Sequence, residues 1–222
     1  MGYKLDDKDI KLTGKQWTKI GTGVKGDVYK YRNMALKVFK EDRDTPIDVY
    51  TAEYLTSIST DRILLPQNLL FYNNSFKGYT YKLVSKRGSG QRMIMLPKQD
   101  LIQDIRVLEE DIKTLSNKSV LLNGISPENS IFNGELYLVD PTEYRVLENC
   151  STKELEELNK FQLHLLLTTL ISLELRRNNF TSKTERDVKE LFNLREIGEN
   201  SSRFFSDVIG NNETVKEFVK KI

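Results

Sequence analysis

The chain has 222 residues, of which 38% are hydrophobic and 30% are charged, a mixture typical of a globular protein rather than a disordered one. Its formal net charge is only +2, which argues against a dedicated nucleic-acid binder. With one cysteine, Cys150, and one histidine, His164, the chain can form no intramolecular disulfide and no Cys-based metal site. The polar N-terminus lacks the apolar core of a signal peptide, and the longest apolar region, 161–175, is too short and interrupted to span a bilayer. We therefore expect a cytoplasmic protein with no membrane span.

The first part of the chain predicts short strands and one helix. Two pairs of segments rich in Val, Tyr, Phe and Leu are each separated by turn residues, which is typical of β-hairpins. The helix begins after Pro46, because apolar residues recur there on one face. The strands are expected at 26–31, 34–39, 69–72 and 79–84, the turns at Asn33 and at Asn73, Asn74 and Gly78, and the helical face at Val49, Ala52, Leu55 and Ile58.

From Gln99 onward the pattern is mainly helical. A stripe of apolar residues with charged residues between them predicts a long amphipathic helix, and an Asn-Gly turn predicts a short hairpin after it. A flexible connector at 85–90 separates this part from the first. The stripe is Leu101, Ile105, Leu108, Ile112 and Leu115, the hairpin strands are 130–132 and 135–139, and further helices are expected at 153–175, 185–194 and 214–221.

A glycine-rich stretch runs from Gly21 to Val28 with the pattern Gly-x-Gly-x-x-Gly-x-Val. Glycines at these places let a backbone turn approach phosphates closely and offer N–H donors. A strand rather than a helix follows, so the pattern does not fit a dinucleotide fold. Taken alone, it also fits a glycine-rich hairpin that binds no ligand.

Lys37 lies within the apolar segment Ala35-Leu36-Lys37-Val38-Phe39. Burying an ammonium group is costly without a partner. We predict that this partner is Glu53 on the following helix. The alternative is an exposed lysine on an edge strand.

Asn129 and Asp140 lie near the ends of the two strands of the short hairpin. An amide oxygen and a carboxylate placed together can bind Mg²⁺, which also takes oxygen ligands from phosphates. The alternative, for each residue taken alone, is that its side chain only stabilises a turn.

In their order along the chain, these elements resemble the protein kinase superfamily from about Trp17 to Asp140. The resemblance implies an α+β, two-lobed protein-kinase-like fold in a single domain. Residues 1–87 would form a β-rich N-lobe with one helix and residues 88–222 a helical C-lobe. It further implies that the protein binds ATP and Mg²⁺.

The resemblance also implies a role for each matching residue. Lys37 would hold the α- and β-phosphates, Glu53 would orient it, and Asn129 and Asp140 would bind the metal, with Lys37 and Asp140 as the catalytic residues. The glycine-rich stretch would cover the nucleotide through Gly21, Thr22, Gly23, Val24, Gly26 and Val28.

Three departures from the family pattern bear on function. Gly124 stands where the family has its catalytic-loop Asp, Asp-Phe-Gly is replaced by Asp140-Pro141-Thr142, and the activation segment is reduced to roughly a dozen residues. The sequence leaves Asn123, Glu128 and Glu143 as unranked candidates to replace the lost group. We expect an unorthodox or weak phosphotransferase that acts on a hydroxyl, either that of a protein Ser or Thr, which we favour, or that of a small molecule. The alternative is a pseudokinase, a nucleotide-binding module that interacts with a protein partner.

Overall fold

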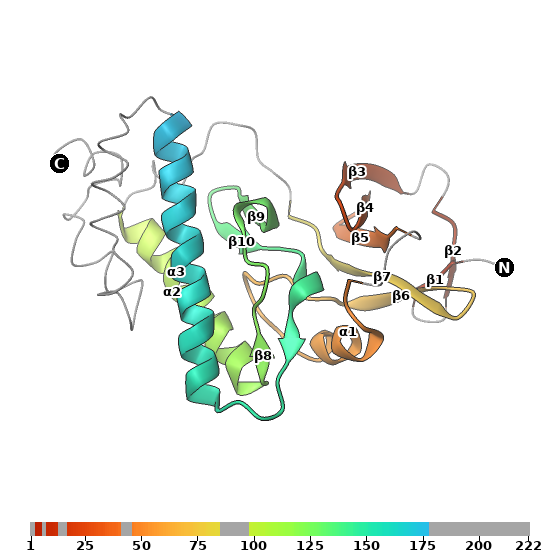
Figure 1. The fold of residues 1–222 in the computed structure, drawn as a ribbon. Helices are drawn as coiled ribbons and strands as arrows, with labels where there is room; N and C mark the ends of the chain where they lie inside the picture. The colour runs from red at the N-terminus through yellow and green to blue at the C-terminus, as the bar shows by residue number, and fades with distance from the viewer. Residues whose placement is uncertain (1–2, 6–7, 13–16, 41–45, 85–97, 178–222) are drawn as a thin grey trace.

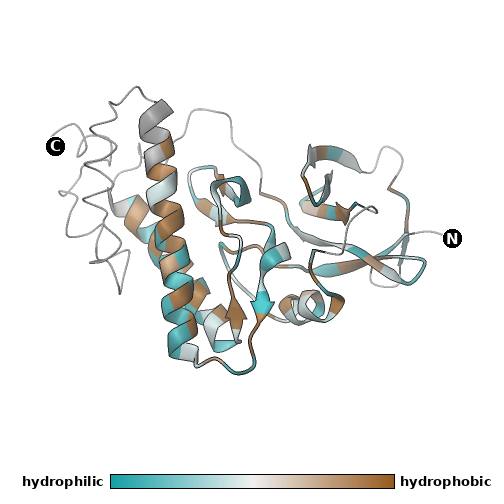
Figure 2. Ribbon diagram, in the orientation of Figure 1, coloured by the Kyte–Doolittle hydropathy of each residue, from teal (hydrophilic) through white to brown (hydrophobic). Residues whose placement is uncertain are grey.

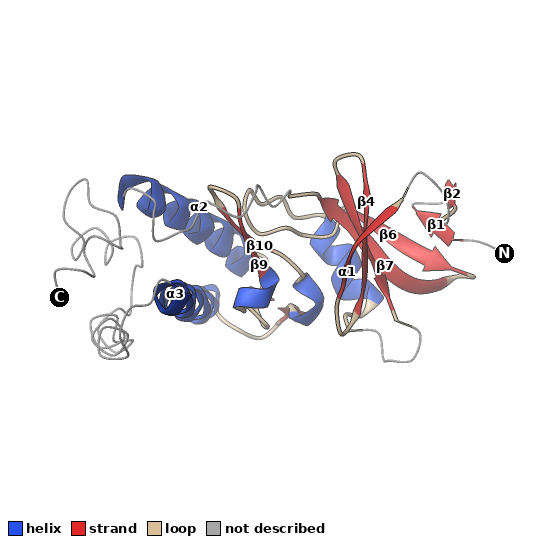
Figure 3. Cartoon of the chain, turned by 90° about the horizontal axis from the view of Figure 1, so that it is seen from above, coloured by secondary structure: helices blue, strands red, loops and turns tan. Residues whose placement is uncertain are grey.

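A computed structural model describes residues 3–5, 8–12, 17–40, 46–84 and 98–177 (Figure 1). These residues form an α+β fold with a mostly antiparallel sheet, as expected for the fold class. The expected connector at 85–90 and the expected helices at 185–194 and 214–221 lie outside the described residues. Seen from above, the large sheet and α1 occupy one end, α2 and α3 the other, and the hairpin β9–β10 lies between them (Figure 3).

The large sheet has seven strands in the order β2-β1-β6-β7-β5-β4-β3, and every described pairing in it is antiparallel. The two hairpins predicted in the first part of the chain are therefore confirmed, although the last strand of the second one is Ser75–Lys82 rather than 79–84. The central strands carry the β-branched and aromatic residues that favour pleated structure. The strands are β1 (Tyr3–Leu5), β2 (Lys8–Ile10), β3 (Thr18–Thr22), β4 (Gly26–Tyr31), β5 (Met34–Phe39), β6 (Asn68–Tyr72) and β7 (Ser75–Lys82).

The turn between β6 and β7 consists of Asn73 and Asn74, both with positive φ, of 50° and 63°. Two successive residues of this kind form the turn type that suits the twist of a hairpin. Gly78 was expected in the same connection but lies inside β7, with a φ of 154°. A Cβ on Gly78 would lie 1.9 Å from the carbonyl oxygen of Lys37, so the close approach of β7 to β5 requires glycine here.

Helix α1 (Val49–Thr56) begins at Asp48, whose carboxylate accepts a hydrogen bond of 2.8 Å from the backbone N–H of Thr51. The predicted apolar face is confirmed for Ala52 and Leu55, which are fully buried, whereas Ile58 lies beyond the end of the helix at Thr56. This face packs toward β6 and joins the main hydrophobic core.

The second part of the chain contains α2 (Lys98–Asn117) and α3 (Thr152–Arg177), which pack against each other. Both confirm the expected helices, and hydrophobic and hydrophilic residues occur along each of them (Figure 2). No helix of the described residues is both long and apolar enough to cross a membrane. Between α2 and α3 lie β8 (Val120–Leu121), a 3-10 turn η2 (Pro127–Asn129), β9 (Ser130–Phe132), β10 (Leu136–Leu138), a second 3-10 turn η3 (Pro141–Glu143) and β11 (Arg145–Val146).

The segment after α1 connects the sheet to the helical part. The carboxylate of Asp111 on α2 accepts hydrogen bonds from three successive backbone N–H groups, those of residues 61, 62 and 63, at 2.7 to 3.0 Å. Ile63 also pairs with Leu138 of β10. Since β10 leads directly to Asp140, these bonds fix that residue relative to the sheet.

Candidate functional site

Lys37 lies on β5 at the centre of the site and is only 5% exposed. Side chains alternate between the two faces of a strand. Leu36 packs in the smaller hydrophobic cluster with Trp17 and Leu70, whereas Phe39 belongs to the main core. Lys37 therefore projects on the same face as Phe39, toward the rest of the protein, and the alternative of an exposed edge-strand lysine is excluded.

The ammonium group of Lys37 forms an ion pair with the carboxylate of Asp140, which lies 103 residues later in the chain. Burial lowers the pKa of Lys37, and the neighbouring Asp140 charge opposes this shift only in part. Burial also raises the pKa of Asp140, but the Lys37 charge and its hydrogen bond outweigh this effect, so that the pKa lies below 3.8. Each charge thus favours the ionised form of the other group, and the Asp140 carboxyl is ionised near neutral pH.

Two further side chains hold the Asp140 carboxylate. Thr142 donates a hydrogen bond of 2.8 Å to its Oδ1 atom, and the hydroxyl of Tyr79 donates one of 3.3 Å to the same oxygen. Tyr79 is directly opposite Lys37 in the β5–β7 register, so the two side chains reach Asp140 from neighbouring strands. Asp140 itself has a left-handed backbone, with φ of 66°, at the start of η3. Asp is among the residues that tolerate this conformation best.

Asn129 lies at the end of η2, and its backbone oxygen accepts a hydrogen bond of 2.8 Å from the N–H of Val139, the residue before Asp140. Its side-chain nitrogen donates to the carbonyl of Gly124 at 2.9 Å, a bond that does not use the amide oxygen. The described residues contain no group of three or more His, Cys, Asp or Glu side chains that could hold a metal ion. One carboxylate and one amide oxygen nevertheless suit Mg²⁺, which commonly uses one or two protein oxygens together with substrate phosphates. The donor set fits such an ion.

The glycine-rich stretch forms the turn between β3 and β4. Gly21 and Thr22 end β3, Gly26 begins β4, and the N–H of Gly23 donates to the carbonyl of Gly26 at 2.8 Å. A Cβ on Gly26 would lie 2.5 Å from the carbonyl oxygen of Val38, so the approach of β4 to β5 needs a glycine at this position. Val24 is exposed in the turn, and Val28 on β4 is opposite Lys37. The turn thus lies beside the strand that carries the buried lysine.

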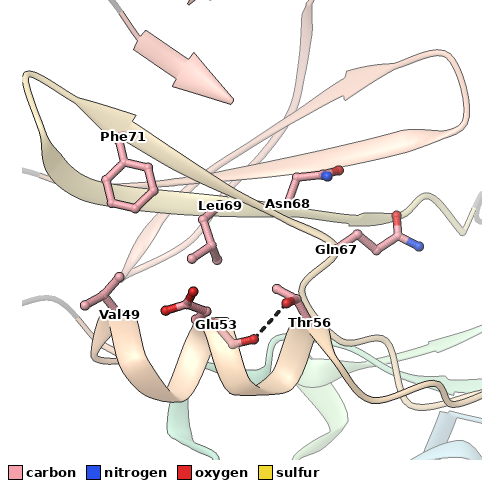
Figure 4. A pocket seen from close by; sticks show the side chains of 7 residues that line it. All are labelled: Val49, Glu53, Thr56, Gln67, Asn68, Leu69 and Phe71. Carbon is pink, nitrogen blue, oxygen red and sulfur yellow. Dashed lines mark hydrogen bonds between the residues drawn. The ribbon is translucent and has the colours of Figure 1, made fainter. Parts of the chain in front are cut away.

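Glu53 is not the partner of Lys37, so the predicted pair is wrong. Helix α1 turns Ala52 and Leu55 toward the core, which leaves Glu53 exposed on another side of the helix. There it lines a pocket of about 320 Å³ between α1 and β6 (Figure 4). The other residues that line this pocket are Val49, Thr56, Gln67, Asn68, Leu69 and Phe71.

The loop that follows β8 brings Gly124 to the same site. Gly124 has a φ of 71°, a left-handed conformation that glycine adopts without strain. The preceding Leu122 donates its backbone N–H to Oδ1 of the fully buried Asn159 on α3 at 2.8 Å. Asn159 also donates to the carbonyl of Val120 at 2.9 Å, so that α3 fixes the start of this loop.

Two residues at this site were not singled out from the sequence. Asn159 could have been noticed, because it lies four residues from Leu155 and from Leu163 and so interrupts an apolar helical stripe. Tyr79 gave no such signal, since an aromatic residue in a strand is ordinary.

The sequence matches no protein-family model, and comparison with curated proteins finds no significant relative.

Proposed function

We propose that this protein binds ATP with Mg²⁺ and transfers the γ-phosphoryl group to a hydroxyl, most simply that of a protein Ser or Thr. The observation that carries this proposal is the ion pair between buried Lys37 and Asp140, beside both Asn129 and the glycine turn. A structural ion pair does not need a glycine turn and a second oxygen donor next to it. Phosphoryl transfer needs all of them, because it depends on positioning and on charge stabilisation around the phosphates.

In this proposal each group has a defined task. The N–H groups of the glycine turn and the Lys37 ammonium hold the phosphates, and oxygens of Asn129 and Asp140 hold the metal. The metal, when bound, neutralises charge that develops on the transferred group. Lys37, which forms an ion pair with Asp140 in the structure, would then contact the phosphates as well as this carboxylate.

The proposal includes a two-lobed, protein-kinase-like arrangement with a boundary near residue 87, in a cytoplasmic protein. The order of elements along the chain supports it: a sheet with one helix, followed by two long helices with a short hairpin between them. The retained Lys37, Asn129 and Asp140 support it further.

A pseudokinase is the second candidate, and two observations favour it. Gly124 offers no carboxylate where the family pattern has one, and Glu53 does not contact Lys37. In that case, nucleotide binding would stabilise a shape that a protein partner recognises.

Incubation of the pure protein with γ-labelled ATP and Mg²⁺, together with a Ser/Thr-rich acceptor protein, distinguishes the two candidates. The transferase predicts label on the acceptor or on the protein itself, and loss of that label in Asp140→Asn. The pseudokinase predicts binding of ATP without incorporation of label.

A further inference from the structure

The carboxylate of Glu143 lies directly beside Gly124. A Cβ built on Gly124 would lie 2.5 Å from Oε2 of Glu143 and 2.8 Å from its Cδ. The Glu143 side chain therefore fills the space that a side chain on residue 124 would occupy. The loop has no carboxylate of its own at position 124, but the carboxylate of Glu143 lies beside this position.

The position of Gly124 is itself well defined. Its carbonyl accepts the hydrogen bond from the Asn129 side chain, and Asn159 holds Leu122 two residues earlier. Glu143 is fixed from the other side, because η3 begins at Asp140 and closes with a hydrogen bond of 3.1 Å from the N–H of Tyr144 to the carbonyl of Pro141. The two segments meet next to the proposed metal ligands.

Glu143 also forms an ion pair with Lys25 of the glycine turn, 118 residues away. Its side chain is 43% exposed, so it is open to an incoming group. The carboxylate thus lies between the turn that would cover the phosphates and the loop that would face the acceptor. The two other candidates left by the sequence have no such position in the described contacts: the Glu128 side chain is exposed on η2, and Asn123 has no acidic group.

We propose that Glu143 is the acceptor-side catalytic residue of the transferase proposed above, on which this inference rests. Its carboxylate accepts a hydrogen bond from the acceptor hydroxyl. The hydroxyl oxygen forms a bond to the γ-phosphorus as the bond from that phosphorus to the β–γ bridging oxygen breaks. ADP leaves with the electron pair of the broken bond, and the hydroxyl proton passes to Glu143. Positioned groups of this kind typically contribute about 10²–10⁴-fold to the rate.

The test compares Glu143→Gln with Glu128→Gln, a matched control on the neighbouring loop. Label transfer from γ-labelled ATP and ATP affinity by calorimetry are measured for each variant and for the natural protein. We expect Glu143→Gln to lose about 10²-fold or more of the transfer rate while its ATP affinity stays within about threefold, and we expect Glu128→Gln to change neither. Transfer by Glu143→Gln at the natural rate would overturn the assignment.

Two further outcomes separate this inference from the proposed function. A natural protein that binds ATP with Mg²⁺ but transfers no phosphate would overturn the role of Glu143 and leave the nucleotide site standing. A natural protein that binds no ATP would overturn both.

A second readout needs no activity. Gly124→Ala should lower the melting temperature less in a Glu143→Ala background than in the natural protein, because the new Cβ no longer meets the carboxylate. An equal loss in both backgrounds would mean that Glu143 does not occupy the space beside Gly124, which contradicts the proposal.

Discussion

Removal of either partner of the Lys37–Asp140 pair should destabilise the protein, but by unequal amounts. The Lys37 side chain is 7% exposed and that of Asp140 is 22% exposed. Asp140→Asn leaves a buried ammonium without the carboxylate that balances it, a loss of about 3–5 kcal/mol in other proteins. Lys37→Met leaves a carboxylate that is closer to solvent and keeps its hydrogen bonds from Tyr79 and Thr142, so we expect a smaller loss, of about 1–2 kcal/mol. Asparagine is chosen at position 140 because it tolerates the left-handed backbone there.

The double variant should cost less than the sum of the two single variants, since the cost of leaving one charge unpaired disappears when both charges are removed. Urea unfolding at neutral pH measures these energies, and we expect a coupling of about 1–3 kcal/mol. Lys160 and Glu156 on α3 form a partly exposed pair at 2.6 Å and serve as the control, with an expected coupling of about 0.3–0.5 kcal/mol. Equal losses for the two single variants, with a coupling no larger than that of the control, would refute the reasoning.

Three further predictions follow from described contacts. Because the pKa of Asp140 is lowered in the folded state, the stability that this shift contributes is present above the ordinary pKa of an Asp and is lost as the pH falls through the lowered value. In Lys37→Met the lysine charge no longer outweighs burial, so this acid loss should become smaller; thermal denaturation across pH measures it, and an acid loss as large as in the natural protein would contradict the reasoning. Asp111→Ala should lower the free energy of unfolding by about 2–4 kcal/mol in urea, because three backbone N–H groups lose their acceptor. A loss below about 1 kcal/mol would contradict this, because it would mean that water replaces the carboxylate as acceptor. Gly78→Ala should lower the melting temperature by several degrees, because the new Cβ would meet the carbonyl oxygen of Lys37. Gly21→Ala serves as the control, since its Cβ would meet only Val28, at 3.8 Å, and similar melting temperatures for the two variants would refute the close approach of β7 to β5.

Much of the fold could be predicted because the signals for it are local. The Asn73-Asn74 turn and the apolar stripe of α2 each depend on residues a few positions apart. Lys37 could be singled out because a lysine within an apolar strand is unusual in itself. Asp140 could be singled out because it lies near the end of a strand of the short hairpin. The placement of Gly78 failed because glycine is common in turns, and only the packing of β7 against β5 shows why it is needed in a strand.

The pairings across the site could not be predicted in the same way. Glu53 was predicted because it lies on the helix that follows the strand of Lys37, but the apolar face of α1 turns toward the core and leaves Glu53 away from Lys37. The actual partner comes from a segment 103 residues later. The proximity of Glu143 to Gly124 depends likewise on how η3 packs against the loop after β8. Such contacts are set by tertiary packing rather than by residue spacing.

Calorimetric titration with ATP tests the central claim, that Lys37, Asn129 and Asp140 form a nucleotide site. We predict binding that requires Mg²⁺ and disappears with a chelator, that weakens at least tenfold in Lys37→Met and in Asp140→Asn, and that is unchanged in the control Lys160→Met. Circular dichroism verifies that each variant is folded at the temperature used. Absence of heat at millimolar ATP and Mg²⁺ with the folded natural protein, or equal affinity in all the variants, would contradict the claim.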